Sequence, residues 1–102
     1  MNVDGRVAIV TGGGTGVGRA TSMRLAELGC AVIVNYSRSR EEAEATVAGI
    51  VALGGQARAV AADVAVYDDC RRLVATALDQ FGPLDILVNN AATTAFIPLD
   101  DF

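Results

Sequence analysis

The chain has 102 residues, of which 52% are hydrophobic and 20% charged, so it is long enough for one domain and too apolar for intrinsic disorder. Its net charge of −4 argues against nucleic acid or an anionic membrane as the main partner. All eight basic residues are arginines. Without lysine or histidine the chain cannot carry a histidine base, a lysine Schiff base or a histidine-rich metal site.

The first third of the chain predicts two strands around one helix. The run 7–10 is continuously apolar and leads into a glycine cluster, which is typical of a strand buried on both faces. A helix is expected next, ended by Gly29. Its predicted apolar face consists of Val17, Ala20, Thr21, Leu25 and Leu28. The run 31–34 predicts a second buried strand.

A second helix and a third strand are expected to follow. Ser39 and Glu42 have the spacing of a capping box, which places the helix start there. The predicted apolar stripe of this helix consists of Ala43, Val47, Ile50 and Val51. Gly54 and Gly55 end the helix, and residues 57–62 predict a strand that is weaker because it is rich in alanine.

A third helix and a fourth strand complete the pattern. Asp68 and Asp69 suit the first turn of the helix. Its predicted apolar stripe consists of Cys70, Leu73, Val74, Ala77 and Phe81. Gly82 and Pro83 break the helix before the strand at 86–88, and residues after Asn89 are expected to form a loop.

This alternation predicts the α/β class, with one domain over residues 1–102. Right-handed crossovers give a doubly wound parallel sheet of about four strands in the order 3-2-1-4, with three helices. The fourth strand would then be an edge, which predicts self-association of the isolated domain.

A glycine-rich loop joins the first strand to the first helix, where residues 11–18 read Thr-Gly-Gly-Gly-Thr-Gly-Val-Gly. Glycines there permit a tight turn and let backbone N–H groups approach a pyrophosphate at the helix N-terminus. The loop therefore indicates a Rossmann-type dinucleotide site, with a ligand-free turn as the alternative. The G-x-G-x-x-G spacing is not met, because position 17 is valine, and a P-loop is excluded because it needs a lysine.

The end of the second strand indicates which nucleotide is preferred. Residues 35–38 read Asn-Tyr-Ser-Arg, without the acid that NAD enzymes and many methyltransferases place here to hold a ribose. An arginine beside a hydroxyl suits the 2′-phosphate of NADP, so Ser37 and Arg38 favour NADP(H) over NAD(H). Two alternatives stay open: Arg38 as a solvated loop charge, and Arg40 as the phosphate ligand.

Four segments together resemble the short-chain dehydrogenase/reductase superfamily. Residues 11–18 fit its T-G-x-x-x-G-x-G pattern, and Asp63-Val64 is similar to its adenine-pocket Asp-Val. Residues 81–88 read Phe-Gly-Pro-Leu-Asp-Ile-Leu-Val, which is also typical, and residues 89–92 resemble its Asn-Asn-Ala-Gly with alanine in place of the glycine. Each segment is at most moderately specific alone. In this order and spacing they are highly specific and cover the whole chain.

The resemblance implies three groups of cofactor-binding residues. Those that would line the pyrophosphate and ribose are Gly12, Gly14, Thr15, Gly16, Val17 and Gly18. Asp63 would accept a hydrogen bond from the adenine amino group and Val64 would pack on the ring; the alternative for Asp63 is a turn residue at the strand end. Those that would contact the nicotinamide-side ribose are Asn90, Ala91 and Ala92, whereas Asn89 would brace the sheet.

The resemblance also implies the activity, which is hydride transfer between nicotinamide and a carbonyl or alcohol carbon. In the family a tyrosine, a lysine four residues later, a serine and usually an asparagine catalyse this step, downstream of the Asn-Asn-Ala-Gly segment. The near match of Tyr67 with Arg71 falls in the wrong part of the fold. No catalytic residue is therefore expected in this chain, which would be cut short, inactive alone, and homo-oligomeric when full length.

Three interpretations of function follow. The first is the cofactor-binding half of an NADP(H)-favouring oxidoreductase with a small carbonyl or alcohol substrate. The second is a non-catalytic NADP-binding module. The third is an inactive truncated remnant or an unrelated Rossmann protein such as a methyltransferase.

Cysteine usage and hydropathy indicate the compartment. Cys30 and Cys70 match neither a metal-ligand spacing nor a small disulfide framework, so we expect two buried thiols. The N-terminus lacks the pattern of a signal peptide, and no stretch approaches the ~20 apolar residues of a membrane helix. We expect a cytoplasmic protein that binds no metal and no membrane.

Overall fold

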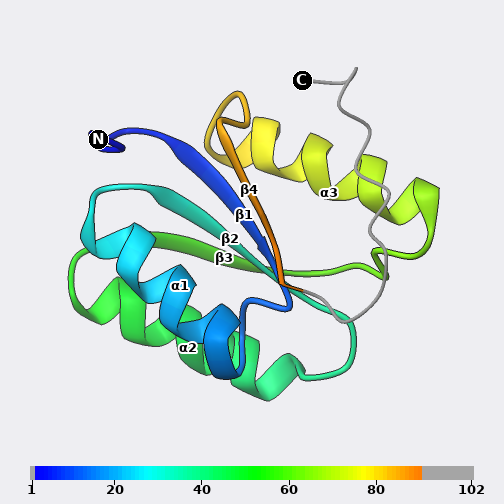
Figure 1. The fold of residues 1–102 in the computed structure, drawn as a ribbon, viewed down its shortest axis with the longest axis horizontal. Helices are drawn as coiled ribbons and strands as arrows, with labels where there is room; N and C mark the ends of the chain where they lie inside the picture. The colour runs from blue at the N-terminus through cyan, green and yellow to red at the C-terminus, as the bar shows by residue number, and fades with distance from the viewer. Residues whose placement is uncertain (1, 91–102) are drawn as a thin grey trace.

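The computed structural model of the chain describes residues 2–90, along which strands and helices alternate (Figure 1). In chain order these elements are β1 (Val7–Thr11), α1 (Gly16–Glu27), β2 (Ala31–Tyr36), α2 (Arg40–Ala52), β3 (Gln56–Ala61), α3 (Tyr67–Gln80) and β4 (Ile86–Asn89). The described residues thus have the predicted α/β alternation.

The four strands form one parallel sheet in the order β3-β2-β1-β4, which confirms the predicted order. Ile9 of β1 lies opposite Ile33 of β2 on one side and Leu87 of β4 on the other. The chain runs outward from β1 to β3 and then returns to the far side of β1. This reversal creates a switch point at the carboxyl ends of β1 and β4, where open α/β sheets bind ligands.

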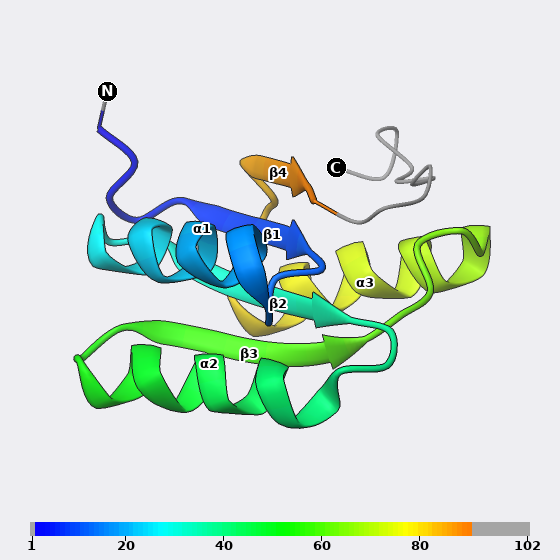
Figure 2. The same cartoon turned by 60° about the horizontal axis from the view of Figure 1, so that its bottom comes forward.

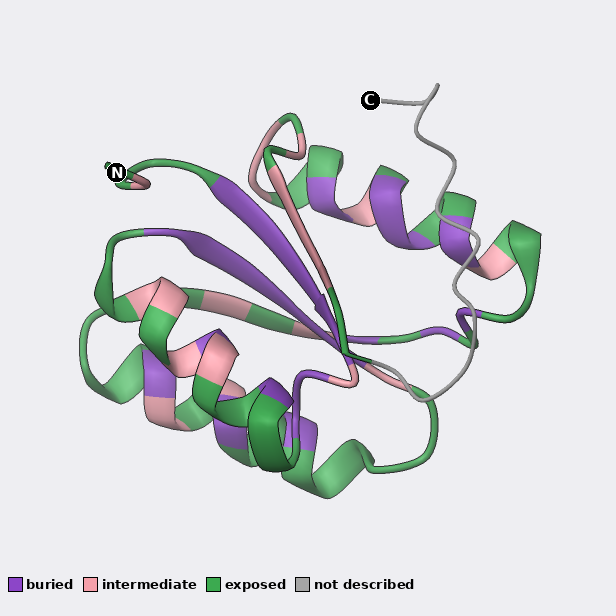
Figure 3. Cartoon of the chain, in the orientation of Figure 1, coloured by how far each residue is buried: buried purple, intermediate pink, exposed green. Residues whose placement is uncertain are grey.

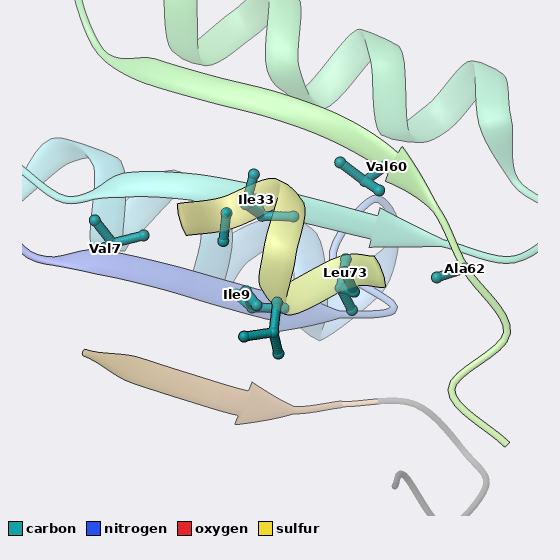
Figure 4. Close-up of a cluster of buried hydrophobic side chains, with 8 residues drawn as sticks. Val7, Ile9, Ile33, Val60, Ala62 and Leu73 are labelled. Atoms are coloured by element: carbon teal, nitrogen blue, oxygen red, sulfur yellow. The ribbon is translucent and has the colours of Figure 1, made fainter. Parts of the chain in front are cut away.

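Helices cover both faces of the sheet, α1 and α2 on one face and α3 on the other (Figures 1 and 2). The buried cluster on the α3 face, drawn in Figure 4, consists of Val7, Ile9, Ile33, Val60, Ala62, Leu73, Val74 and Ala77. The buried cluster under α1 and α2 consists of Ala8, Val10, Cys30, Val32, Val34, Ala43 and Ile50. Successive strand residues point to opposite faces, so two covered faces require unbroken apolar runs in β1 and β2.

Burial falls from the central strands towards the edges of the sheet (Figure 3). Ile9 and Ile33 are completely buried, and each contributes about 2 kcal/mol through the apolar surface it removes from water. Residues of β3 alternate between exposed and more buried positions, while the three apolar residues of β4 are only half-buried. Core stability is therefore concentrated in β1 and β2.

The apolar face predicted for α1 is wrong. The buried residues of this helix are Gly18 and Ser22, whereas Val17 is 71% exposed and Leu28 is 42% exposed. The helix lies so close to the glycine loop that only small residues fit between them. Of the larger predicted residues, Leu25 packs against the core from the flank of the helix.

The start of α2 is as predicted, but the capping box is wrong. Ser39 is the N-cap residue, and its side chain makes no capping hydrogen bond. Its ψ of 60° lies outside the extended conformation from which an N-cap oxygen reaches the first-turn N–H groups. Glu41 and Glu42 instead favour the helix start by placing negative charge in its first turn.

The buried stripe of α2 is rotated from the predicted one. Ala43 and Ile50 are buried as expected, but Val51 is 54% exposed. The pattern predicted that Val47 would be buried, but Val47 is only half-buried, and its neighbour Thr46 is completely buried instead. The reason is a polar contact made by the Thr46 hydroxyl, described below.

The predicted stripe of α3 is confirmed, since the buried residues of this helix are Cys70, Leu73, Val74 and Ala77, with Phe81 partly buried. Both cysteines are buried and free of disulfides, as expected. Burial raises the pKa of the Cys30 thiol, and the nearby carboxylates of Asp4 and Asp85 raise it further. Among residues 2–90, no helix is both long and apolar enough to cross a membrane.

Candidate functional site

A cavity of about 410 Å³ opens at the carboxyl ends of β1, β2 and β3. Its lining residues are Gly12, Gly14, Thr15, Asn35, Tyr36, Ser37, Arg38, Ser39, Ala62, Asp63, Val64 and Asn90. The cavity therefore lies at the edge of the sheet where the switch point is, and it is framed by the loops that follow the four strands.

The cavity brings together most of the residues predicted to bind a cofactor. Those that line it are Gly12, Gly14, Thr15, Ser37, Arg38, Asp63, Val64 and Asn90. Gly16, Val17 and Gly18 do not line it and form the first turn of α1 beside it. Ala91 and Ala92, also predicted, lie outside the described residues.

Two glycines are needed where the glycine loop touches its neighbours. A Cβ atom on Gly18 would collide with the carbonyl oxygen of Gly12. A Cβ atom on Gly14 would lie 2.6 Å from the Cα of Ala43, so any side chain there would push α2 away. These glycines therefore let α1 and α2 pack directly against the loop.

The start of α1 lies beside the cavity and is not capped by any side chain among the described residues. Thr15 is its N-cap residue and makes no side-chain capping bond, and no acidic residue lies in the first turn. The first N–H groups of a helix have no partner within it and carry a partial positive charge. This end of α1 is therefore suited to an anionic group such as a phosphate.

Asn35, at the end of β2, is a site residue that sequence reasoning missed. Its side chain is buried, donates through Nδ2 to the carbonyls of Val60 (3.3 Å) and Ala62 (3.1 Å), and accepts through Oδ1 from the N–H of Gly12 (3.3 Å). Its own carbonyl accepts from the N–H of Gly13 at 3.0 Å. The available signal was an amide in an otherwise buried apolar strand, which must be paired to be stable there.

The contacts of Arg38 and Arg40 show which of the two arginines could bind a phosphate. The Nε of Arg40 donates to Oε1 of Glu44 at 3.1 Å, and this bond raises the pKa of Arg40. Arg38 has no ion-pair partner among residues 2–90 and lies in the cavity wall beside Ser37. Arg38 is therefore the arginine free to meet an anionic ligand.

The loop after β3 is stabilised by its own polar groups. Asp63 accepts through Oδ1 from the N–H of Ala65 at 2.9 Å, and its own N–H donates to Oδ2 of Asp69 at 2.8 Å. Asp63 is thus a turn residue, the alternative considered above. Its other carboxylate oxygen has no hydrogen-bond partner within the described part of the chain, and Asp63 lines the cavity, so the turn role leaves one oxygen for a ligand.

The end of β4 is tied to β1 and the glycine loop. The Thr11 hydroxyl donates to Oδ1 of Asn89 at 3.1 Å and accepts from the N–H of Asn90 at 2.9 Å. Nδ2 of Asn90 donates to the carbonyl of Gly12 at 3.3 Å. Asn89 thus braces the sheet, as the pattern indicated, and Asn90 is placed at the cavity.

The tyrosine–arginine pair that most nearly matches the family's catalytic pair is not part of this cavity. Tyr67 and Arg71, the near match to a catalytic pair, lie on α3 and do not contribute to its lining. Among the described residues, no cluster of acidic, cysteine or histidine side chains could hold a metal ion. The glycine loop, the start of α1 and Arg38 together suit an anionic ligand such as a phosphate.

Comparison with known proteins identifies the family. Residues 6–102 match the family model described as short chain dehydrogenase, so the chain belongs to the short-chain dehydrogenase family. This is a family of oxidoreductases that bind a nicotinamide dinucleotide. The resemblance found in the sequence motifs is confirmed.

Relatives and solved structures agree with this assignment. The chain is 52% identical over 101 residues to the short-chain dehydrogenase/reductase homolog YusS of Bacillus subtilis, covering 99% of this chain and 93% of that protein. It is 49% identical over 89 residues to a 3-oxoacyl-[acyl-carrier-protein] reductase of Synechocystis, covering 87% of this chain and 36% of that protein. The structure of a Burkholderia cenocepacia short chain dehydrogenase in complex with NADP superimposes with a TM-score of 0.85 at 45% identity, covering 100% of this chain and 42% of that one. Apart from YusS, the chain thus spans well under half the length of these relatives.

Proposed function

We propose that the cavity binds NADP(H) and that the chain is the cofactor-binding portion of an oxidoreductase. The reaction would be hydride transfer between the nicotinamide and a small carbonyl or alcohol substrate. The observation that carries the cofactor preference is the end of β2, where Ser37 lines the cavity together with Arg38, which has no ion-pair partner among residues 2–90. The next carboxylate along the chain is Glu41, in the first turn of α2. A guanidinium there matches a phosphate dianion, whereas NAD-binding sites carry an acid at this point.

The rest of the dinucleotide follows from the order of groups around the cavity. The N-terminus of α1 and the glycine loop would bind the diphosphate, and Asp63 with Val64 would bind the adenine. Asn90, with Ala91 and Ala92 after it, would meet the ribose next to the nicotinamide. The Burkholderia dehydrogenase, which is 45% identical to this chain, was solved in complex with NADP, and this supports NADP(H) as the proposed cofactor.

Charge reversal at Arg38 tests the preference for NADP(H). Arg38→Glu should weaken NADPH binding by about 1–3 kcal/mol, or about 5- to 150-fold in Kd, because a charge-assisted contact is replaced by repulsion. NADH binding should change little. The measurement is isothermal titration of the purified protein with each nucleotide.

Arg40→Glu is the matched control, since Arg40 lies two positions on and is paired with Glu44. It should leave the ratio of NADPH to NADH affinity unchanged. Equal weakening of both nucleotides by Arg38→Glu would contradict the assignment, and a selective loss of NADPH in Arg40→Glu would move the phosphate site to Arg40.

The 102 residues alone are proposed to bind cofactor without turnover. They contain no lysine, which the family's tyrosine–lysine pair requires, and their near-match tyrosine, Tyr67, does not line the cavity. With NADPH and a panel of small ketones and aldehydes, absorbance at the nicotinamide band should stay constant. Steady loss of that absorbance would overturn this assignment and direct attention to Tyr67.

A further inference from the structure

Three consecutive carbonyls of the glycine loop each accept a hydrogen bond from a side chain of a different element. The Gly12 carbonyl accepts from Nδ2 of Asn90 at 3.3 Å. The Gly13 carbonyl accepts from Oγ of Ser22 in α1, and the Gly14 carbonyl accepts from Oγ1 of Thr46 in α2, each at 3.1 Å. The loop is therefore held by side chains from α1, α2 and the end of β4.

The two hydroxyl groups lie at positions where the helix pattern calls for apolar residues. Ser22 and Thr46 are both completely buried, on the faces of α1 and α2 that meet the glycine loop. A buried hydroxyl is costly unless it is paired. For Ser22 the Gly13 carbonyl is its one hydrogen-bond partner within the described part of the chain, so this bond is what justifies a polar residue there.

Peptide planarity carries the effect of these bonds to the other side of the loop. In a trans peptide the C=O of one residue and the N–H of the next point in opposite directions, and the described residues contain no cis peptide bond. Holding the carbonyls of Gly13 and Gly14 inward therefore turns the N–H groups of Gly14 and Thr15 outward. Both residues line the cavity, and within residues 2–90 neither N–H donates to another protein group.

We propose that Ser22 and Thr46 are positioning residues that orient the Gly14 and Thr15 N–H groups towards the diphosphate of the dinucleotide. The proposal rests on the proposed function, because it takes the ligand of the loop to be that diphosphate. Ser22 has the larger effect of the two. The single hydroxyl proton of Thr46 is shared with the carbonyl of Glu42, which lies closer at 2.9 Å.

The test compares two ligands that differ in the diphosphate. One is 2′-phospho-ADP-ribose, which carries it, and the other is adenosine 2′-monophosphate, which lacks it. Ser22→Ala should raise the Kd of the first about five- to tenfold, the scale of one hydrogen bond, and change the Kd of the second less than twofold. Thr46→Val should act in the same direction with a smaller change.

Thr21→Val is the matched control. Thr21 precedes Ser22 in α1, and its hydroxyl donates to the Val17 carbonyl within the helix at 2.9 Å, so this variant also loses one hydroxyl but leaves the loop carbonyls paired. It should change neither Kd. A general loosening of the fold would weaken both ligands together, which would overturn the positioning role, as would an unchanged Kd for 2′-phospho-ADP-ribose in both Ser22→Ala and Thr46→Val.

The outcomes also separate this inference from the proposed function. If the unmodified protein does not bind 2′-phospho-ADP-ribose, the proposed function fails. If it binds and the hydroxyl variants bind equally well, the proposed function stands and only the positioning role is lost.

Discussion

At the scale of single residues, packing rather than hydropathy decides what α1 can present to the loop. Gly18 and Ser22 form its buried face because the Gly12 carbonyl lies where a side chain at position 18 would begin. A glycine in a helix normally lowers stability relative to alanine. Here the close approach reverses that preference.

Gly18→Ala and Gly49→Ala should therefore change stability in opposite directions. At Gly18 the new methyl group overlaps backbone, which should lower the free energy of unfolding by about 2–3 kcal/mol. At Gly49, inside α2, the nearest atom to a new Cβ would be the Met23 methyl at 3.6 Å, so alanine should raise stability by about 0.5–1 kcal/mol.

Urea denaturation followed by circular dichroism measures both changes. Equal stability of the two variants would show that α1 can move away from the loop at little cost, contrary to the close contact described above.

Residues of the site could be predicted where their role lies in backbone geometry or exposed charge. The glycine loop, Arg38 and Asp63 are of this kind, since each follows the end of a strand and contributes to the cavity. Asn35, Ser22 and Thr46 could not, because reading periodicity equates buried with apolar. These three side chains are stable in buried positions because they form hydrogen bonds with backbone groups of the glycine loop, which lie far away in the sequence.

At the scale of elements, the contribution of each helix follows from the face it covers. Among the described elements α3 alone covers one face of the sheet, and Leu73 at its centre is completely buried against Ile9 and Ile33. The same helix exposes Leu78 to 54%. These two leucines share a helix and a chemistry but differ in burial.

Leu73→Ala should lower the free energy of unfolding by about 2–4 kcal/mol, through lost apolar burial and the cavity left behind. Leu78→Ala should change it by less than about 0.5 kcal/mol. Thermal denaturation of both variants provides the measurement. A large loss in Leu78→Ala would indicate that this side of α3 is covered by another surface in solution.

The order of strands and helices could be predicted because the apolar runs that form strands and the glycines that end helices are local features of the sequence. Continuous apolar runs mark β1 and β2, and glycines mark the ends of α1 and α2. The orientation of α1 and α2 about their axes was not predictable to the same degree. It depends on how closely the glycine loop lets each helix approach, as the exposure of Val17 and Val51 shows.

At the scale of the whole molecule, folding and binding use different parts of the sheet. The buried clusters lie along the length of β1 and β2, whereas the cavity lies beyond their carboxyl ends. The strand order that creates this division was predictable from the right-handed crossover rule. Because Arg38 is an exposed loop residue away from both clusters, its variants report on binding without changing the core.

Asn35 connects the separate parts of the cavity wall. Through one side chain and one carbonyl it joins the glycine loop to β3 and to the start of the loop that carries Asp63. The surfaces proposed for the diphosphate and the adenine are therefore joined by hydrogen bonds to a single residue. Hydrogen bonds that connect the parts of a site in advance reduce the ordering that a ligand has to cause, so more of the interaction free energy remains as affinity.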